Sequence, residues 1–450
     1  MVDRRRVTID LDSGTLPGVV ESRIQVLAAG TSGSKLDNSQ LSTDATLGGG
    51  TPSDTLIPAQ TAVKAYVDSI DTTDLADFDT AVQTSRVGVT SNVYGFGPTS
   101  LRKWKKALAR VRSGGGDAKI LCVGDSTTLG AGTPTPYLGA YTHWLAQEMK
   151  RSFAPTEKGL AIAHLNPDVR WTVGSGWNLG TAQGYGWATW PSTSNGYFDC
   201  TTDGATLTFT PGGSALYDKF DVYVFEYTGT GTAAITATGG SAVNVVAGVQ
   251  ALASGIVKKY TATAASLSST NSVTIAKTGT TQLIVFAIEP WNSTASTIRI
   301  GNAGVSGTGS DAWAAQVGFA PGASPRKNIE AYAPDLTIID LGINSAVLNR
   351  DPATVASELA LVVSSAQVSG DVIYKTMIPS NDTTYADREA IIVANMLASG
   401  VPVIDVFGRI TSFGGGAAYN TAGFMYDTLH GNALAYAEVA GWVLEALRSV

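Results

Sequence analysis

The sequence predicts an α/β protein in which a parallel sheet, covered on both faces, is interrupted by an inserted β-sandwich and preceded by an extended N-terminal region. Apolar runs alternate with helical patterns near the middle of the chain and again through its last third, as is typical of parallel sheets. Short β-branched runs separated by glycine-containing turns lie between these two stretches. We therefore predict four parts, with boundaries at residues 1–92, 93–190, 191–294 and 295–450.

The N-terminal part, residues 1–92, has few aromatic side chains and many Thr, Ser, Asp and Gly residues. Ala62, Val63, Tyr66 and Val67 recur at helical spacing, with Pro58 near the expected helix start. A helix this thin buries little apolar surface alone, so we expect it to pack against copies of itself or against a partner.

Two phrases of this part are similar to segments of bacteriophage tail fibre and tail-associated proteins. The first reads D-x-T-L-G and then S-D-x-x-I-P-x-Q-x-A-V-K-x-Y-V-D between residues 44 and 68, and the second is residues 78–86. The resemblance implies an attachment and oligomerisation region that binds other tail proteins, and by analogy with fibre proteins a homotrimer. The alternative interpretation is an ordinary linker with one helix.

The first α/β segment, residues 93–190, opens with a helix expected over residues 101–111, with Trp104, Leu108 and Val111 on its apolar side. Its basic side chains indicate either a solvated face or a site for an anionic ligand, and we favour the solvated face. These side chains are Arg102, Lys103, Lys105, Lys106, Arg110 and Arg112. The apolar run at residues 119–123 predicts a buried strand, and residues 137–151 predict a helix.

The segment at residues 191–294 has the pattern of an all-β insertion. Alternating or β-branched runs occur at residues 205–210, 220–227, 233–238 and 282–288, with Gly-Gly, Thr-Gly and Asn-containing turns between them. This spacing of short strands predicts a β-sandwich.

The last segment, residues 295–450, returns to alternation. Strands are expected at residues 335–341, 371–378 and 401–406, and helices at 353–367, 385–399 and 432–450. Because ligands bind beyond the carboxyl ends of strands in such sheets, polar groups that follow apolar runs are candidates for one site. Three stretches have this position: Gly124–Ser126, Asn302 and Gly342–Asn344.

Ester hydrolysis by a serine needs a hydroxyl, a base, a group that orients the base, and donors for the oxyanion. Ser126, between a strand and a helix, is the candidate hydroxyl. His430 is the candidate base, because Asp427 lies three residues before it and can accept its Nδ1 proton. His143 is interpreted as structural and His164 as a loop residue.

Candidate oxyanion donors are the backbone N–H of Ser126, a glycine in the segment Gly301–Gly307 and the side-chain amide of Asn344. The four phrases that hold these groups, in this order, resemble the SGNH (GDSL-type) hydrolase family. The phrases are Gly124–Ser126, Asn302–Gly307, Gly342–Asn344 and Asp427–His430.

This resemblance covers about residues 95–190 and 295–450 and implies a serine esterase with a flavodoxin-like three-layer α/β/α fold. It implies Ser126 as nucleophile, His430 as base and Asp427 as its partner. It also implies an oxyanion hole made by Ser126, Gly307 and Asn344. The family often has Asp after the third-block Asn, whereas this chain has Ser345, a difference that affects how the Asn is supported.

Composition excludes several other classes. The net charge of −7 without a basic stripe disfavours nucleic-acid binding, and no apolar run is long enough for insertion into a membrane. The N-terminus lacks the apolar region of a secretion signal. Cys122 and Cys200 do not indicate a disulfide framework, and without HExxH or CxxC spacing we expect neither a metal site nor a cofactor.

These observations lead to one expected function. We expect a phage tail protein, located in the virion, that removes O-acyl groups, with O-acetyl as the expected group, from host surface polysaccharide. The inserted sandwich looks like a carbohydrate-binding module, and Trp177, Trp187 and Trp313 are the candidate sugar-stacking residues. The alternatives are a non-enzymatic receptor-binding fibre on the same scaffold and a bacterial carbohydrate esterase without a virion role.

Overall fold

The computed structural model describes most of the chain after residue 91. The described residues are 92–97, 99–152, 156–162, 170–179, 197–212, 214–249, 251, 255–315, 324–380, 385–412 and 414–449, with the two-residue strands β1, Leu41–Ser42, β2, Ile57–Pro58, β8, Thr189–Trp190, and β9, Ser194–Asn195. The chain divides into two units, residues 1–91 and 92–450.

In the first unit, β1 pairs with β2 in parallel. The helix expected around residues 62–67 and the phrase at residues 78–86 lie outside the described residues. The second unit carries all the other elements described below.

A mixed sheet runs through the second unit, and its parallel part holds the strands expected from the sequence. Six strands of this part run parallel, in the order β5, Thr156–Ile162; β18, Ile298–Gly304; β4, Ala118–Gly124; β19, Leu336–Asp340; β20, Asp371–Lys375; and β21, Val403–Ile404. Without β5, the strands lie side by side in the order β18, β4, β19, β20 and β21. Numbered by their position in the chain this is 2-1-3-4-5, which is the flavodoxin-like order. The short β3, Val93–Tyr94, closes this edge antiparallel to β21.

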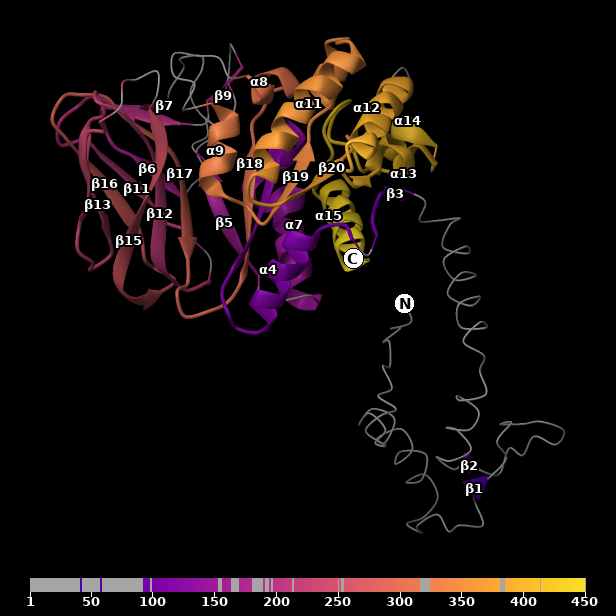
Figure 1. Cartoon of the computed structure of the whole chain (residues 1–450), viewed down its shortest axis with the longest axis horizontal. Coiled ribbons are helices and arrows are strands. Elements are labelled where there is room, and N and C mark those ends of the chain that lie inside the picture. The colour runs from indigo at the N-terminus through magenta and orange to yellow at the C-terminus, as the bar shows by residue number, and fades with distance from the viewer. Residues whose placement is uncertain are drawn as a thin grey trace. The chain divides into compact units, whose positions relative to one another are not determined.

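Helices cover both faces of this parallel part, which gives three layers (Figure 1). One face packs against α4, Arg102–Arg112; α7, Tyr141–Ser152; and α15, Ala433–Arg448. The other packs against α8, Ser310–Ala314; α9, Pro325–Tyr332; α11, Pro352–Gln367; and α12, Ala386–Ala398. The predicted α/β class with a parallel sheet is thus confirmed.

Strand β4 shows why its sequence is apolar without interruption. Ile120 and Cys122 enter the core beneath α4, α7 and α15, whereas Leu121 and Val123 enter the core on the opposite face. Successive side chains of a strand point to opposite faces, so a central strand covered on both sides needs apolar residues at every position.

The short helices lie near the strand ends. They are α5, Ser126–Leu129; α6, Pro136–Gly139; α10, Ile343–Val347; α13, Val406–Ser412; and α14, Gly415–Thr421. The single helix expected over residues 137–151 is divided into α6 and α7. Gly139 ends α6 where a Cβ atom would lie 2.3 Å from Thr133, so the chain turns at a position that only glycine allows.

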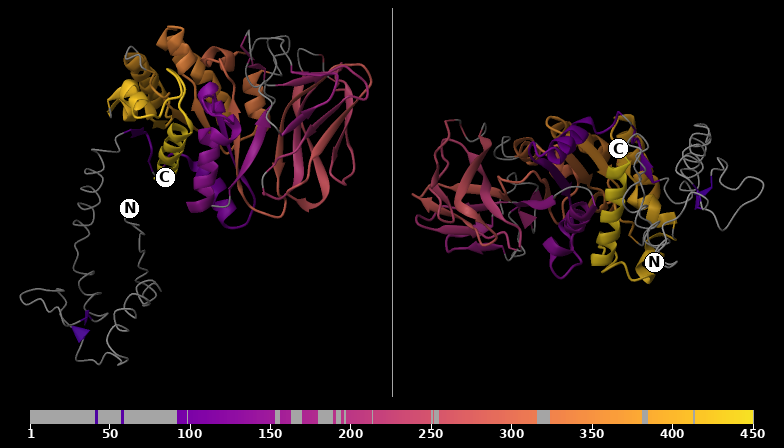
Figure 2. Two further views of the ribbon diagram at one scale, coloured as in Figure 1. Left: turned by 180° about the vertical axis from the view of Figure 1, so that it is seen from behind. Right: turned by 90° about the horizontal axis from the view of Figure 1, so that it is seen from below.

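The β-sandwich consists of two strand layers. One layer extends the central sheet with β17, Leu283–Trp291; β12, Tyr217–Glu226; and β15, Ile256–Ser268. The short β10, Phe198–Cys200, pairs with β17, and β7, Trp177–Leu179, pairs with β10. The second layer contains β14, Val243–Val245; β13, Thr232–Ala237; β16, Val273–Thr278; β11, Thr206–Phe209; and β6, Trp171–Val173. Figure 2 shows these strands together at one end of the second unit.

Two features of the sandwich differ from the prediction. Its boundary at residue 191 is wrong, because β6 pairs with β11 and β7 pairs with β10. The sandwich is also continuous with the parallel sheet, since β17 pairs antiparallel with β5. Strands of three residues are too short to show an alternating pattern, so no periodicity indicates that the sandwich starts before residue 191.

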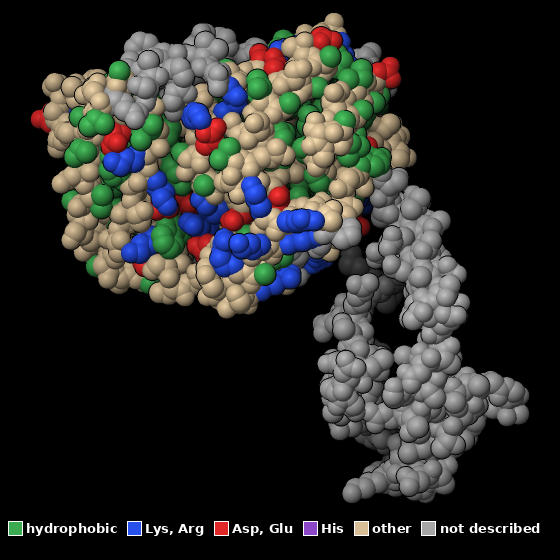
Figure 3. Space-filling view, in the orientation of Figure 1, with side chains coloured by type: hydrophobic (Ala, Val, Ile, Leu, Met, Phe, Trp, Pro, Cys, Tyr) green, Lys and Arg blue, Asp and Glu red, His purple; other side chains and the backbone are tan. Residues whose placement is uncertain are grey.

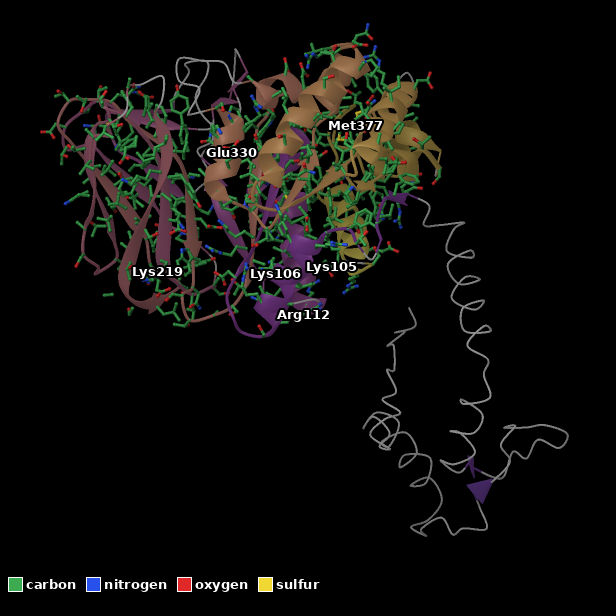
Figure 4. All side chains as sticks on the ribbon, viewed as in Figure 1. Lys105, Lys106, Arg112, Lys219, Glu330 and Met377 are labelled. Carbon is green, nitrogen blue, oxygen red and sulfur yellow. The ribbon has the colours of Figure 1, made fainter. Side chains whose placement is uncertain are left out.

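Helix α4 buries Trp104, Leu108 and Val111 and carries its basic side chains on the outer side. Figure 3 shows Lys and Arg side chains gathered along this edge of the unit, and Figure 4 labels Lys105, Lys106 and Arg112 there. Arg110 forms an ion pair with Asp335 at 3.2 Å. No described helix combines the length and the apolar composition needed to cross a membrane.

Candidate active site

The candidate nucleophile lies on a tight turn between β4 and α5. Asp125 caps α5 by accepting hydrogen bonds from the backbone N–H and the hydroxyl of Thr127, both at 2.9 Å. Ser126 is the first residue of α5 and is buried. A Cβ atom at Gly124 would lie 2.0 Å from Thr128 Oγ1 and 2.7 Å from the Asp340 carbonyl oxygen. Only glycine therefore permits this approach of the turn to β19.

The candidate base lies on a closed loop before α15. Met425 and Gly431 pair across the loop, and Asp427 Oδ1 accepts the backbone N–H groups of Leu429 and His430, each at 2.7 Å. The other carboxylate oxygen, Asp427 Oδ2, lies 2.8 Å from His430 Nδ1. Three hydrogen bonds therefore hold the Asp427 carboxylate, and all three donors belong to residues 427–430, the segment that carries the imidazole.

A continuous hydrogen-bonded chain joins these two loops. Ser126 Oγ lies 2.9 Å from His430 Nε2, although the residues are 304 positions apart. Because Asp427 is the acceptor at Nδ1, the imidazole carries its proton on Nδ1 and presents an unprotonated Nε2 to the serine hydroxyl. Burial alone would raise the pKa of Asp427, but the hydrogen bonds from the His430 ring and from the backbone N–H groups of Leu429 and His430 hold it below its usual value. Asp427 therefore stays ionised and keeps this tautomer.

Helix α15 fixes the imidazole loop against the serine turn. Asn432 caps α15 through the N–H groups of Leu434 and Ala435 and donates from its side chain to the Gly423 carbonyl at 2.6 Å. The Tyr436 hydroxyl donates to the carbonyl of Ala131 at 2.7 Å, just after α5. The relative position of Ser126 and His430 is therefore set by rigid elements on both sides.

The three strands that precede the candidate oxyanion donors, β4, β18 and β19, end at the same edge of the sheet. Gly304 of β18 and Asp340 of β19 are both paired in register with Gly124. Gly307 follows β18 with a φ of 77°, a conformation that favours glycine. Asn344 stands on α10 and donates one amide hydrogen to the carbonyl of Thr308 at 2.9 Å. This bond ties α10 to the Gly307 loop and leaves the second amide hydrogen of Asn344 as a donor.

Asn302, the first residue of the second phrase, lies within β18 rather than after it. Its side chain donates to the Thr128 carbonyl at 2.8 Å and to Thr142 Oγ1 at 3.0 Å, and it accepts the Gly304 N–H at 2.9 Å. Asn302 therefore holds α5 and α7 against β18.

Ser345, which directly follows Asn344, belongs to a polar network. Ser345 Oγ lies 3.3 Å from Ser310 Oγ, which donates to Glu358 at 2.6 Å. Arg350 bonds both oxygens of Glu358 and pairs with Asp311. These contacts connect α10 to α8 and α11 and so support the helix that carries Asn344.

Sequence reasoning missed a buried polar cluster beneath the serine turn. Asp340 Oδ2 accepts a hydrogen bond from Thr128 Oγ1 at 2.8 Å and shares the single hydroxyl hydrogen of Thr127 with Asp125, at 3.2 Å from Thr127 Oγ1. Asp340 Oδ1 pairs with Lys375 at 2.8 Å. Burial and the nearby Asp340 carboxylate raise the pKa of Asp125. The sequence pattern that indicates such a cluster is an Asp and a Lys in otherwise apolar strands. Because a buried charge needs a partner, the two residues can be expected to pair.

Two of the three candidate sugar-stacking residues, Trp177 and Trp313, are buried. Trp177 is 6% exposed and packs in the core of the sandwich. Trp313 is fully buried in α8 and donates its indole N–H to Thr308 Oγ1 at 3.2 Å. The prediction of substrate contact is therefore wrong for both residues, because both side chains are packed inside hydrophobic cores. Trp187 lies outside the described residues.

His143 and His164 are the two histidines that the sequence does not assign to catalysis. His143 is half-buried on α7, with its ring 5.5 Å from that of Trp144, and His164 lies outside the described residues. In the described part of the chain, His, Cys, Asp and Glu side chains form no group of three or more that could hold a metal ion.

Replacing Asn344 with alanine is expected to lower kcat for ester hydrolysis about 10²- to 10³-fold with a small effect on KM, because an oxyanion donor acts mainly in the transition state. Steady-state kinetics with 4-nitrophenyl acetate measures both constants. Asn395→Ala, which removes an exposed amide on α12, is the matched control. A kcat within threefold of the wild-type value would exclude Asn344 as a donor.

A second prediction concerns Glu389, a buried residue of α12 that accepts the Tyr374 hydroxyl at 3.0 Å. Burial raises the pKa of Glu389 to about 8 from an ordinary 4.5. Between these two values the folded chain holds a proton that the unfolded chain has lost. The free energy of unfolding should therefore fall as pH rises through this window, by at most about 1.4 kcal/mol per pH unit, and level off above it.

Glu389→Gln should remove this contribution, so urea unfolding from pH 5 to pH 8 should show a shallower decline than in the wild type. Glu445→Gln changes a half-exposed carboxylate on α15 and should leave the slope unaltered. Parallel slopes for the wild type and Glu389→Gln would contradict the prediction.

No protein-family model matches the chain, and no curated protein matches its sequence. Among solved structures, the chain is similar to a peptidoglycan O-acetylesterase, with 16% identity, a TM-score of 0.59, and coverage of 79% of this chain and 97% of that one. A two-domain esterase active on acetylated mannans matches with 12% identity, a TM-score of 0.37, and coverage of 77% and 53%. A family two carbohydrate esterase from Cellvibrio japonicus matches with 9% identity, a TM-score of 0.24, and coverage of 64% and 99%. The first similarity shows a shared fold, and the TM-scores of the other two are too low to do so.

Proposed function

We propose that this protein is a serine esterase that removes O-acetyl groups from polysaccharide. The observation that carries the proposal is the hydrogen-bonded chain from Ser126 through His430 to Asp427. A serine hydroxyl, an imidazole in the correct tautomer and an ionised carboxylate form the set of groups that acyl transfer requires.

The geometry supports a two-step reaction. Ser126 Oγ attacks the ester carbonyl carbon while His430 Nε2 takes the hydroxyl proton. The carbonyl oxygen becomes an oxyanion held by the N–H groups of Ser126 and Gly307 and by the Asn344 amide. The carbon–oxygen bond to the alcohol then breaks, and His430 returns the proton to the departing oxygen, which leaves an acyl group on Ser126. Water, activated by His430, releases the acid and restores the serine.

The polysaccharide substrate is supported by two observations. The fold is shared with a peptidoglycan O-acetylesterase, an enzyme whose name specifies an acetylated glycan. The imidazole loop is open to solvent, since the side chains of His430 and Asp427 are 22% and 43% exposed. A site at this edge of the sheet admits an ester that projects from a large polymer.

The biological setting is proposed from the N-terminal part alone. Its resemblance to tail fibre segments supports a phage tail fibre or tailspike that acts on host surface polysaccharide during attachment, with other tail proteins and two further copies of the chain as partners. Mass spectrometry of purified virus particles tests this setting. Absence of the chain from the particles would favour a bacterial carbohydrate esterase.

The activity is tested by measuring acetate release from a panel of purified O-acetylated surface polysaccharides, with Ser126→Ala as the inactive control. We expect release from at least one polysaccharide by the wild type and none by the variant. Binding to a polysaccharide without acetate release would overturn the esterase proposal and support a non-enzymatic receptor-binding fibre.

A further inference from the structure

Tyr426 is unusual among the aromatic side chains of the second unit. Its side chain is 69% exposed, and it is the one aromatic among the large exposed apolar side chains of the described residues. A tyrosine ring in water forgoes the stabilisation that its burial would supply. An exposed ring beside a reaction centre therefore calls for a functional explanation.

Tyr426 is fixed on the loop that carries the imidazole. It directly precedes Asp427, and its backbone N–H donates to the carbonyl of His430 at 2.9 Å. The neighbouring pair of Met425 and Gly431 closes the loop beneath it. The ring thus projects from a backbone held as firmly as the imidazole.

The Tyr426 and His430 side chains leave this loop on the same side. A Cβ atom placed on Gly132 would lie 3.0 Å from Tyr426 Cβ and 3.1 Å from His430 Cβ. Both side chains therefore start beside the segment that follows α5, the helix that begins with Ser126. Gly132 has a φ of 90°, and the absence of a side chain there lets the two loops meet.

The reaction determines which part of the ester lies on this side. The carbonyl oxygen faces Asn344 and Gly307, whereas the alcohol oxygen must face His430, because His430 protonates it as it leaves. A residue that borders His430 therefore borders the alcohol portion of the ester and not its acyl group.

We infer that Tyr426 forms the stacking surface for the sugar ring that bears the acetyl group. The inference rests on the proposed function and deepens it, since it assigns the recognition of the saccharide to one residue. A pyranose ring presents a face of C–H groups that packs on an aromatic face, and its hydroxyl groups pair with the polar tip of tyrosine. The exposed polar neighbours Asp427 and Thr428 favour a hydroxylated partner over a hydrocarbon chain.

The test compares two esters that differ in the alcohol. Glucose pentaacetate offers the C–H face of a sugar ring to Tyr426 but no free hydroxyl group, so it tests the stacking contact alone. Ethyl acetate has an alcohol too short to cover the tyrosine ring. For Tyr426→Ala we expect the ratio of kcat/KM values, glucose pentaacetate over ethyl acetate, to fall about tenfold, mainly through KM. Tyr426→Trp, which keeps an aromatic face, should hold the ratio within about twofold of the wild-type value. Acid release in a pH-stat measures both reactions.

Leu361→Ala changes a side chain that is 45% exposed on α11 and is the control for an unrelated surface truncation. An unchanged ratio in Tyr426→Ala, with the wild type active on both esters, would overturn the inference and leave the proposed function standing. A wild-type protein that releases acid from neither ester would overturn the proposed function and the inference together. Equal thermal midpoints for the variants show that the substitutions leave the overall fold intact.

Discussion

Ser126→Ala is expected to lower the rate of 4-nitrophenyl acetate hydrolysis by about 10⁴- to 10⁶-fold, the range found when the nucleophile of a serine hydrolase is removed. Alanine has no hydroxyl to attack the carbonyl, and the imidazole of His430 is left without the group that it activates. The oxyanion donors remain, so a small residual rate above that of water is expected.

The fold should tolerate this change. The hydrogen bond from Ser126 Oγ to His430 joins two loops, but α5 is held by its own backbone bonds and by the Asp125 cap. Ser113→Ala, at the exposed end of α4, serves as the matched control. If Ser126→Ala kept a tenth or more of the wild-type rate at an unchanged thermal midpoint, the nucleophile would have to be another group.

Lys375→Met is expected to lower the free energy of unfolding by about 3–5 kcal/mol, the cost of leaving one charge of a buried pair without its partner. Lys375 is 1% exposed, and its ammonium lies 2.8 Å from Asp340 Oδ1. Without it, the Asp340 carboxylate is left buried beside the hydroxyl groups of Thr127 and Thr128 with no positive charge from Lys375 to balance it. Urea unfolding monitored by fluorescence measures the change.

A double-mutant cycle separates this pair from simple loss of packing. Asp340→Asn alone should also destabilise the chain, whereas Lys375→Met with Asp340→Asn should cost clearly less than the sum of the two single changes. Strict additivity would show that the two side chains contribute independently. Because Asp340 also holds the serine turn, the single variants should in addition lower kcat, and this effect does not follow from stability alone.

The polar groups that define the candidate site could be predicted because each one follows a recognisable local pattern. An apolar run before Gly124 indicated a strand, and Asp427 three residues before His430 indicated a carboxylate within reach of an imidazole. Both patterns extend over fewer than ten residues, the range within which backbone periodicity and turn chemistry determine conformation. The hydrogen bonds then found, from Ser126 to His430 and from His430 to Asp427, use those same groups.

The burial of individual aromatic side chains could not be predicted in this way. The sequence predicts Trp177 and Trp313 as sugar-stacking residues, whereas packing places both in hydrophobic cores. Tyr426 lies in a short polar loop and carried no periodic signal, yet it is the one large exposed aromatic side chain among the described residues. Exposure depends on what other elements cover a position, and those elements come from distant parts of the chain.

By itself the sequence determined the class of the fold and the main strands and helices of the α/β part, and it proposed the groups of the candidate site. Only the tertiary structure decided the pairing in register of Gly124 with Gly304 and Asp340, the continuity of the sandwich with the parallel sheet and the buried partnership of Asp340 with Lys375. The physical reason is that periodicity records which face of an element is apolar, whereas the neighbour that covers that face is chosen by packing and strand pairing over the whole chain.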